Sequence, residues 1–426
     1  MLNRLTAPPY QPIQQIILPA AEVTRFSNGA RLHVLKNTAQ PVVRLQLVFP
    51  AGRWYDPTPG ISLLTARTLL DGTVSRSTRQ IADEVAFYGA ALDCEQGFDR
   101  STLTLYCLTK HLTKLLPLVQ DVVLNASFPS ADLEQMKART IQNIRVERQK
   151  TSYLASERLS RNLFGSHHPY GIPFNESSFS SLSTESVQVF HRKHYSLTQA
   201  EIFVCGDIDN THVAQITDFF GTLGAPTSIE PPQPTPLAPQ SSPTDYVAVK
   251  ESLQATLRLG RLWPEPSHPD SHALQLLTKV LGGYFGSRLM KNIREDKGLT
   301  YGIYASIAQR EQASHIIIGS DVNAANAQTA INEINVELNR LQQELIPHDE
   351  LVTVKNYITG KFLNELGTVF EQCDKYKTLL MLGLPLNHYS QYLETVNAAT
   401  SDDLLTLAQQ YLSPSDFLEV VAGPTK

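Results

Sequence analysis

The sequence lacks the features that mark several large classes of protein. Its four cysteines lie far apart and none forms a C-x-x-C pair, which argues against a disulfide framework or a zinc knuckle and favours core thiols. No stretch approaches the ~20 apolar residues of a membrane span, and the N-terminal run 16–21 is interrupted by Pro19. We therefore expect no membrane association and a cytoplasmic protein, with a periplasmic location left open.

An excess of positive charge is also missing. The chain has 36 Lys and Arg against 41 Asp and Glu, a net charge of −5, which gives no support for nucleic acid or an anionic membrane as partner. Its 426 residues are too many for one ordinary domain, and a hydrophobic share of 42% is enough for real cores. We expect two or three domains.

The first half of the chain predicts a mixture of strands and helices. Alternating apolar residues predict two strands within 22–52, at 30–35 and 42–49, a hairpin at 92–107 and a strand at 201–207. Apolar residues at helical spacing predict helices after Gly60 and over roughly 110–124, 130–150, 153–164 and 209–221. Ser77 and Gln80 form a capping box for one further helix.

A proline-rich segment divides the chain. Seven prolines among Ser, Thr and Gln in residues 222–244 predict a linker between an N-terminal domain, 1–221, and a C-terminal domain, 245–426. The second half then repeats the order of elements: strands at 246–249 and 255–260, a helix at 270–281, a hairpin of 301–308 with 314–322, helices at 325–343, 348–365, 368–382 and 400–411, and a strand at 418–423. This repetition predicts an internal duplication and an α+β fold of two similar domains.

The stretch 282–301 combines a glycine turn, a short helix and the start of a strand. Ser287 is the expected helix cap and Gly298 the expected stop, and Tyr301 begins an alternating strand pattern on the core-facing side. Arg294 and Tyr301 could therefore converge on one point. Taken alone, the spacing favours a cation facing the helix dipole and a tyrosine packed on the core. An anion-binding loop is a weaker alternative, since the P-loop Lys-Ser ending is absent.

Several short motifs together resemble the pitrilysin/insulinase family of zinc peptidases over nearly the whole chain. In the first half they are Ala51-Gly52-Arg53-Trp54-Tyr55-Asp56, Asp71-Gly72-Thr73, Phe128-Pro129, Leu163-Phe164-Gly165-Ser166-His167-His168-Pro169-Tyr170-Gly171, His194-Tyr195-Ser196 and Val204-Cys205-Gly206-Asp207. In the second half they are Leu281-Gly282-Gly283, Ser287-Arg288-Leu289, Arg294-Glu295 and Lys297-Gly298-Leu299-Thr300-Tyr301. The resemblance implies two sheet-plus-helices domains, of the type found in the mitochondrial processing peptidase, that form one half of a clamshell chamber.

The zinc-binding motif of that family is missing. The family carries H-x-x-E-H on a helix, with two histidines on one face as zinc ligands and a glutamate that activates water. When the motif is placed by counting back from Thr73, its two histidine positions hold Leu63 and Arg67 and its glutamate position holds Ala66. The family's third ligand falls at Asn143. The fixed charge of Arg67 would itself disfavour a divalent metal. We therefore expect neither a metal nor another cofactor in this chain.

Two histidine pairs offer the remaining candidates for a metal site. They are His191 with His194 and His268 with His272, and neither has a carboxylate at a suitable spacing. Surface or hydrogen-bonding histidines are the better interpretation.

The resemblance assigns Arg294 and Tyr301 to the family's second catalytic contribution, which reaches the zinc from another domain. It implies a non-catalytic subunit, inactive alone, that supplies this pair to a homologous zinc-bearing partner hydrolysing peptides. The alternatives are an assembly subunit or a peptide-binding scaffold without a role in catalysis. The isolated chain is also expected to form a homodimer in some conditions.

Overall fold

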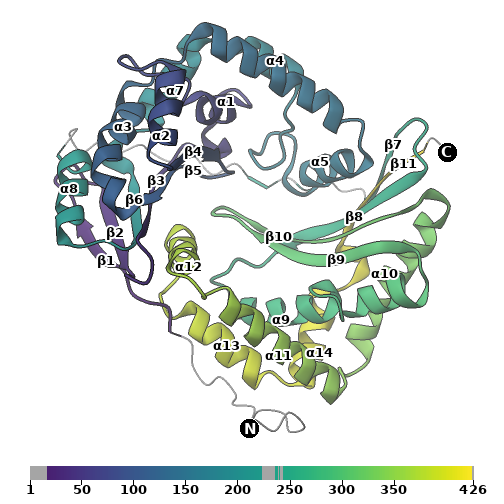
Figure 1. Cartoon of the computed structure of the whole chain (residues 1–426). Coiled ribbons are helices and arrows are strands. Elements are labelled where there is room, and N and C mark those ends of the chain that lie inside the picture. The colour runs from purple at the N-terminus through teal and green to yellow at the C-terminus, as the bar shows by residue number, and fades with distance from the viewer. Residues whose placement is uncertain (1–16, 223–235, 238, 240–242, 425–426) are drawn as a thin grey trace, which may run out of the picture.

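The computed structural model describes residues 17–222, 236, 237, 239 and 243–424. Strands and helices form two layered units, each with one sheet, and the predicted α+β class is confirmed (Figure 1). The predicted linker lies mostly outside the described residues, so the domain limits stay a prediction. Within the described ranges, no helix is long and apolar enough to cross a membrane.

The first sheet has six strands in the spatial order β1-β2-β6-β3-β5-β4. Their bounds are β1 Glu22–Arg25, β2 Arg31–Lys36, β3 Val42–Phe49, β4 Ala91–Gln96, β5 Ser101–Leu108 and β6 Glu201–Gly206. Strands β2 and β6 run parallel and the other neighbours antiparallel. The predicted hairpin is confirmed, with Leu92 of β4 opposite Leu105 of β5.

The second sheet has five strands in the order β7-β11-β8-β10-β9. Their bounds are β7 Thr244–Ala248, β8 Gln254–Trp263, β9 Thr300–Gln309, β10 Ser314–Asn323 and β11 Leu418–Gly423. Only β7 and β11 pair in parallel within this described sheet. Strand β9, which carries Tyr301, therefore lies at an edge of the sheet, and no other strand of the described residues pairs with its outer side.

Helices make up the remaining regular structure of each half. In the first half they are α1 Ile61–Thr68, α2 Thr78–Phe87, α3 Leu112–Asn125, α4 Ser130–Glu147, α5 Thr151–Phe164, α6 Glu176–Ser181, α7 Thr184–His194 and α8 Asn210–Phe220. In the second half they are α9 Ser271–Gly282, α10 Ala327–Gln343, α11 His348–Asn364, α12 Val369–Met381, α13 His388–Ala398 and α14 Ser401–Tyr411. The capping box predicted for α2 is present, since Ser77 Oγ accepts a hydrogen bond from Gln80 N at 3.3 Å.

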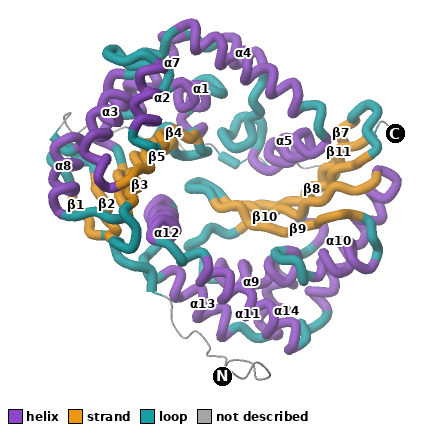
Figure 2. The backbone as a smooth tube through the Cα atoms, viewed as in Figure 1, coloured by secondary structure: helices purple, strands orange, loops and turns teal. Residues whose placement is uncertain are grey.

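One helix of each half packs on the sheet of the other half (Figure 2). Helix α5 of the first half packs on β8 and β11, and helix α12 of the second half packs on β6 and β2. Two apolar clusters fill these contacts: Leu159 and Leu163 of α5 meet Val420 of β11, and Cys373 of α12 meets Phe203. The inner strands of both sheets are thus covered on two faces, which explains why β3 is almost continuously buried.

Ion pairs and a cation–π contact also join the two halves. Arg100, in the turn just before β5, donates two hydrogen bonds to Glu311, at 2.8 and 2.9 Å. Arg44 of β3 donates two to Asp374 of α12, at 2.9 and 3.0 Å. The Arg310 guanidinium lies 3.5 Å from the ring centroid of Phe98. The two halves therefore share both an apolar core and paired charges.

Four elements were not predicted: β1, α6, α7 and α13. Helix α7 had a local signal, because Ser183 Oγ caps it by accepting from Ser186 N at 3.2 Å. Helix α13 has no side-chain cap, and its buried face of Tyr392, Leu393 and Val396 is short. Its position depends on packing against α9, which sequence spacing does not reveal.

Candidate functional site

Arg294 and Tyr301 lie on adjoining elements of the second half. Arg294 belongs to a short π-helical segment, Met290–Asp296, and Tyr301 is the second residue of β9. Between them Gly298 has φ +60°, a left-handed conformation that favours glycine, as predicted for the helix stop. The Leu299 amide then donates to the Ile293 carbonyl at 3.0 Å, which turns the chain directly into the strand.

The predicted cap at Ser287 is wrong. Its hydroxyl makes no capping hydrogen bond; the side chain is fully buried and its Oγ has no hydrogen-bond partner among the described residues. The Ser287 carbonyl instead accepts from Lys291 N at 3.0 Å, within the helical ladder. Tertiary packing of this turn has overridden the local preference for a serine cap.

Tyr301 points away from the core, contrary to the alternating pattern. The register of β9 with β10 shifts between Ser320, opposite Ile303, and Val322, opposite Thr300, so that two residues of β9 stand against Asp321 alone. This is a β-bulge, which redirects side chains. Beyond it Ile303 is buried as expected, whereas Tyr301 is 98% exposed.

The hydroxyl groups of Thr300 and Ser320 stabilise the bulge through hydrogen bonds to the backbone. Thr300 Oγ1 donates to the Asp321 carbonyl at 2.7 Å and accepts from the Gly302 amide at 3.1 Å. Ser320 Oγ donates to the Gly302 carbonyl at 3.0 Å. Sequence reasoning missed these residues, although Thr300 next to the candidate tyrosine was a weak signal.

Arg294 and Tyr301 line the same groove, with a volume of 650 Å³. Its lining residues are Leu253, Gln254, Arg294, Gly298, Leu299, Thr300, Tyr301, Asp321, Val322, Asn323 and Asn326. The Arg294 guanidinium lies 4.6 Å from the ring centroid of Phe285, a cation–π contact that also escaped sequence reasoning. No carboxylate of the described chain forms an ion pair with it. The Arg294 guanidinium and the Tyr301 phenol thus belong to the lining of one groove.

The positions that the resemblance assigns to the metal lie on α1 and α4, which contact each other in the first half. Leu63 is half-buried, Ala66 is buried and Arg67 is exposed on α1, while Asn143 is exposed on α4. Arg67 Nη1 lies 3.4 Å from Thr140 Oγ1 of α4. These side chains do not fit zinc, since an alkyl group, a methyl group and a guanidinium offer no ligand. The described residues contain no cluster of three or more His, Cys, Asp or Glu side chains suited to a metal.

The two histidine pairs are packed elsewhere. His191 and His194 are buried on α7, where burial lowers the pKa of each to about 4, and His194 Nδ1 lies 2.9 Å from the Pro50 carbonyl. His272 contacts His388 rather than His268, with 3.3 Å between Nε2 and Nδ1. These rings belong to packing and hydrogen bonding.

The fold and the groove define a two-domain protein of the M16 peptidase type. The insulinase (peptidase family M16) model matches residues 32–172, and the peptidase M16 inactive domain model matches residues 181–358. The chain therefore belongs to the insulinase family of peptidases, M16. This confirms the resemblance inferred from the motifs.

Relatives and solved structures agree with this assignment. The uncharacterized zinc protease YmxG of Bacillus subtilis is 24% identical over 406 residues, covering 93% of this chain and 97% of the relative. An uncharacterized zinc protease of Mycobacterium leprae is 26% identical over 366 residues, covering 84% and 80%. A peptidase M16 inactive domain from Pseudomonas fluorescens superimposes with a TM-score of 0.85 at 23% identity, covering 95% of this chain and 98% of that one. A protease from Helicobacter pylori gives 0.87 at 18% identity, covering 96% and 100%. These two likenesses establish the fold.

Proposed function

We propose that this chain is the metal-free subunit of a two-subunit zinc peptidase and supplies Arg294 and Tyr301 to a homologous zinc-bearing partner. The observation that carries the proposal is the groove on the second half. The β-bulge turns Tyr301 outward at 98% exposure beside the half-buried Arg294. The α1 and α4 positions of the same chain, in contrast, offer no zinc ligands.

Each side chain of the pair has a defined chemical part in this proposal. The Tyr301 hydroxyl donates a hydrogen bond to the oxyanion that develops when water adds to the peptide carbonyl. The Arg294 guanidinium binds a backbone carbonyl or carboxylate of the peptide, in two hydrogen bonds where the acceptor is a carboxylate. Zinc and the water-activating glutamate come from the partner, so no step of hydrolysis occurs on this chain alone.

The open edge of β9 supports an extended peptide as the ligand. An edge strand presents unpaired amide and carbonyl groups, to which a peptide can add as a further strand. Because Tyr301 is in this edge strand, a peptide paired with β9 would pass the phenol. The chamber would then be closed by the partner chain.

Metal analysis and a mixing assay test the proposal. The purified chain alone is expected to contain no stoichiometric zinc and to cleave no quenched-fluorescence peptide. Addition of a homologous subunit with an intact H-x-x-E-H motif is expected to produce cleavage above that of either chain alone. One zinc bound per isolated chain, or cleavage by the isolated chain, would overturn the proposal.

Substitutions in the groove test the role of the pair. We expect Tyr301→Phe to lower the activity of the mixture about 100-fold, the usual scale for loss of an oxyanion donor. Arg294→Ala should also lower it, through loss of the charge-assisted hydrogen bonds to the peptide. Matched controls are Tyr304→Phe on the same strand and Lys291→Ala on the same helical segment, which should keep full activity. If the groove variants stay fully active in a working mixture, the chain acts in assembly or peptide capture and not in catalysis.

A further inference from the structure

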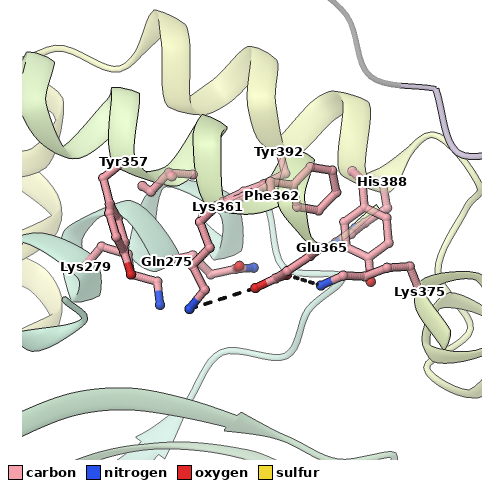
Figure 3. A pocket seen from close by; sticks show the side chains of 11 residues that line it. Gln275, Lys279, Tyr357, Lys361, Phe362, Glu365, Lys375, His388 and Tyr392 are labelled. Atoms are coloured by element: carbon pink, nitrogen blue, oxygen red, sulfur yellow. Dashed lines mark hydrogen bonds and ion pairs between the residues drawn. The ribbon is translucent and has the colours of Figure 1, made fainter. Parts of the chain in front are cut away.

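A second pocket, unrelated to the groove, lies among the helices of the second half. It encloses 160 Å³ between α9, α11, α12 and α13 (Figure 3). Its lining residues are Gln275, Lys279, Tyr357, Ile358, Lys361, Phe362, Glu365, Lys375, His388, Tyr389 and Tyr392. Side chains from four separate helices therefore meet in one small cavity.

The charges in this pocket do not balance. Glu365 is the only acidic residue among its lining side chains, and it pairs with Lys375 at 2.6 Å and with Lys361 at 3.9 Å. Lys279 is a third cation, for which the described residues provide no ion pair. Figure 3 shows the three ammonium groups and the carboxylate on the same side of the helices. One carboxylate thus faces three ammonium groups.

Lys279 carries the uncompensated charge. Its pKa is lowered chiefly by burial, and the charges of Lys361 and Lys375 lower it further against the opposing effect of Glu365. The aliphatic part of the Lys279 side chain passes over Gly283, where an added Cβ would lie 2.5 Å from Lys279 Cδ. The glycine therefore leaves room for the lysine to enter the pocket. Keeping a half-buried cation without a partner costs free energy that a bound anion would offset.

The walls of the pocket suit an anion with an apolar body. Tyr357, Phe362 and Tyr389 supply ring faces, and the Lys375 ammonium lies 5.4 Å from the Phe362 centroid. Burial raises the pKa of Tyr389 to about 12, so its phenol keeps the proton and can donate a hydrogen bond. Gln275 adds an amide that can both donate and accept.

We propose that this pocket is a binding site for an oxyanion on a small apolar or aromatic body, with Lys279 as the main recognition residue. A carboxylate and a phosphate share this chemistry, and the volume admits only a small group. The site is independent of the groove formed by Arg294 and Tyr301. Its occupation needs neither zinc nor a partner chain.

Calorimetric titration of the full chain tests the site. The probes are N-acetylphenylalanine, its uncharged amide, and inorganic phosphate. We expect saturable binding of the carboxylate, of phosphate, or of both, and none of the amide. The comparison of the two anions identifies the source of the oxyanion. No binding of either anion, or equal binding of the amide, would overturn the proposal.

Variants assign the binding to the pocket. Lys279→Gln should weaken anion binding about tenfold or more, the scale of one charge-assisted hydrogen bond, while Lys114→Gln on the exposed face of α3 should not change it. If Lys279→Gln misfolds, the acylation rate of Lys279 in the native chain gives a second measurement. Bound anion should slow acylation of Lys279 severalfold and leave that of Lys114 unchanged. Unprotected Lys279 at saturating anion, or unchanged affinity in folded Lys279→Gln, would contradict the assignment.

Discussion

The hydroxyl of Thr300 donates a hydrogen bond of 2.7 Å to the backbone carbonyl of Asp321, across the bulge that turns Tyr301 outward. Asp321 is the single residue of β10 that faces two residues of β9. The Thr300 side chain therefore connects the irregular part of the edge strand to its neighbour. This relationship makes Thr300 a positioning residue for Tyr301.

Replacement of Thr300 by valine tests that role. Thr300→Val keeps the side-chain shape and removes the hydroxyl, which should cost about 1 kcal/mol of folding stability and lower the activity of a working mixture roughly tenfold. Thr353→Val on the exposed face of α11 is the control. The double variant Thr300→Val/Tyr301→Phe should be no less active than Tyr301→Phe alone. Additive losses would show that Thr300 does not act through the tyrosine.

The ion pair between Arg100 and Glu311 is expected to stabilise the contact between the halves. Arg100→Met leaves a partly buried carboxylate without its partner and should lower the free energy of unfolding by about 2 kcal/mol in urea titrations. Replacing both partners with methionine should recover part of that loss.

A surface pair provides the matched control. Arg79 and Asp83 form an ion pair with side chains 90% and 70% exposed. Arg79→Met should change stability by less than about 0.5 kcal/mol. If Arg79→Met and Arg100→Met lower the free energy of unfolding equally, the ion pair of Arg100 with Glu311 does not stabilise the contact between the halves.

Stability should fall on mild acidification, in part through His194. Burial lowers its pKa from 6.5 to about 4. Between these values the unfolded chain binds more protons than the folded chain, so stability is full above pH 6.5 and decreases toward pH 4. Urea titrations at pH 7.5 and 5.0 should show a smaller difference for His194→Gln than for the native chain, by about 1 to 2 kcal/mol.

The exposed His167 gives the control for this measurement. His167→Gln should retain the full pH difference of the native chain. If His194→Gln also retains it, the ring is protonated in the folded state at a pH well above 4, and its burial does not control its titration.

Restoring the ligands should create a zinc site in the first half. The variant carries Leu63→His, Ala66→Glu, Arg67→His and Asn143→Glu. Because α1 and α4 are in contact, the new side chains should converge and bind about one zinc per chain, measured by metal analysis after dialysis. A folded variant without zinc would show that these positions were assigned wrongly.

A second variant tests whether residue 67 occupies a ligand position. It has the other three substitutions but keeps Arg67. One histidine ligand is then missing and a guanidinium stands beside the cation, so zinc should not be retained. Equal zinc contents of the two variants would contradict the assignment of Arg67 to a ligand position.

Local patterns predicted most helices and strands because the responsible interactions are short in range. The capping box of Ser77 and Gln80 starts α2, and Ile331, Ile334 and Leu338 form the buried face of α10. Such features depend on residues within one or two turns. The order of strands in the two sheets depends on distant pairings and could not be obtained in this way.

The candidate site was predicted only in part for the same reason. The family resemblance singles out Arg294 and Tyr301, and both line one groove. The alternating pattern nevertheless pointed Tyr301 inward, because the bulge arises from pairing with Asp321 on another strand. The local pattern around Ser287 predicts a helix cap, but the packing around the turn buries this side chain.

The exchange of α5 and α12 also constrains how the chain can be made. Residues 369–381, which cover the face of the first sheet around Phe203, are synthesised long after the last strand of that sheet, Glu201–Gly206. The first half must then either remain loosely folded or be shielded until the last helices arrive. Because each half completes the core of the other, we expect neither half to fold as an independent protein.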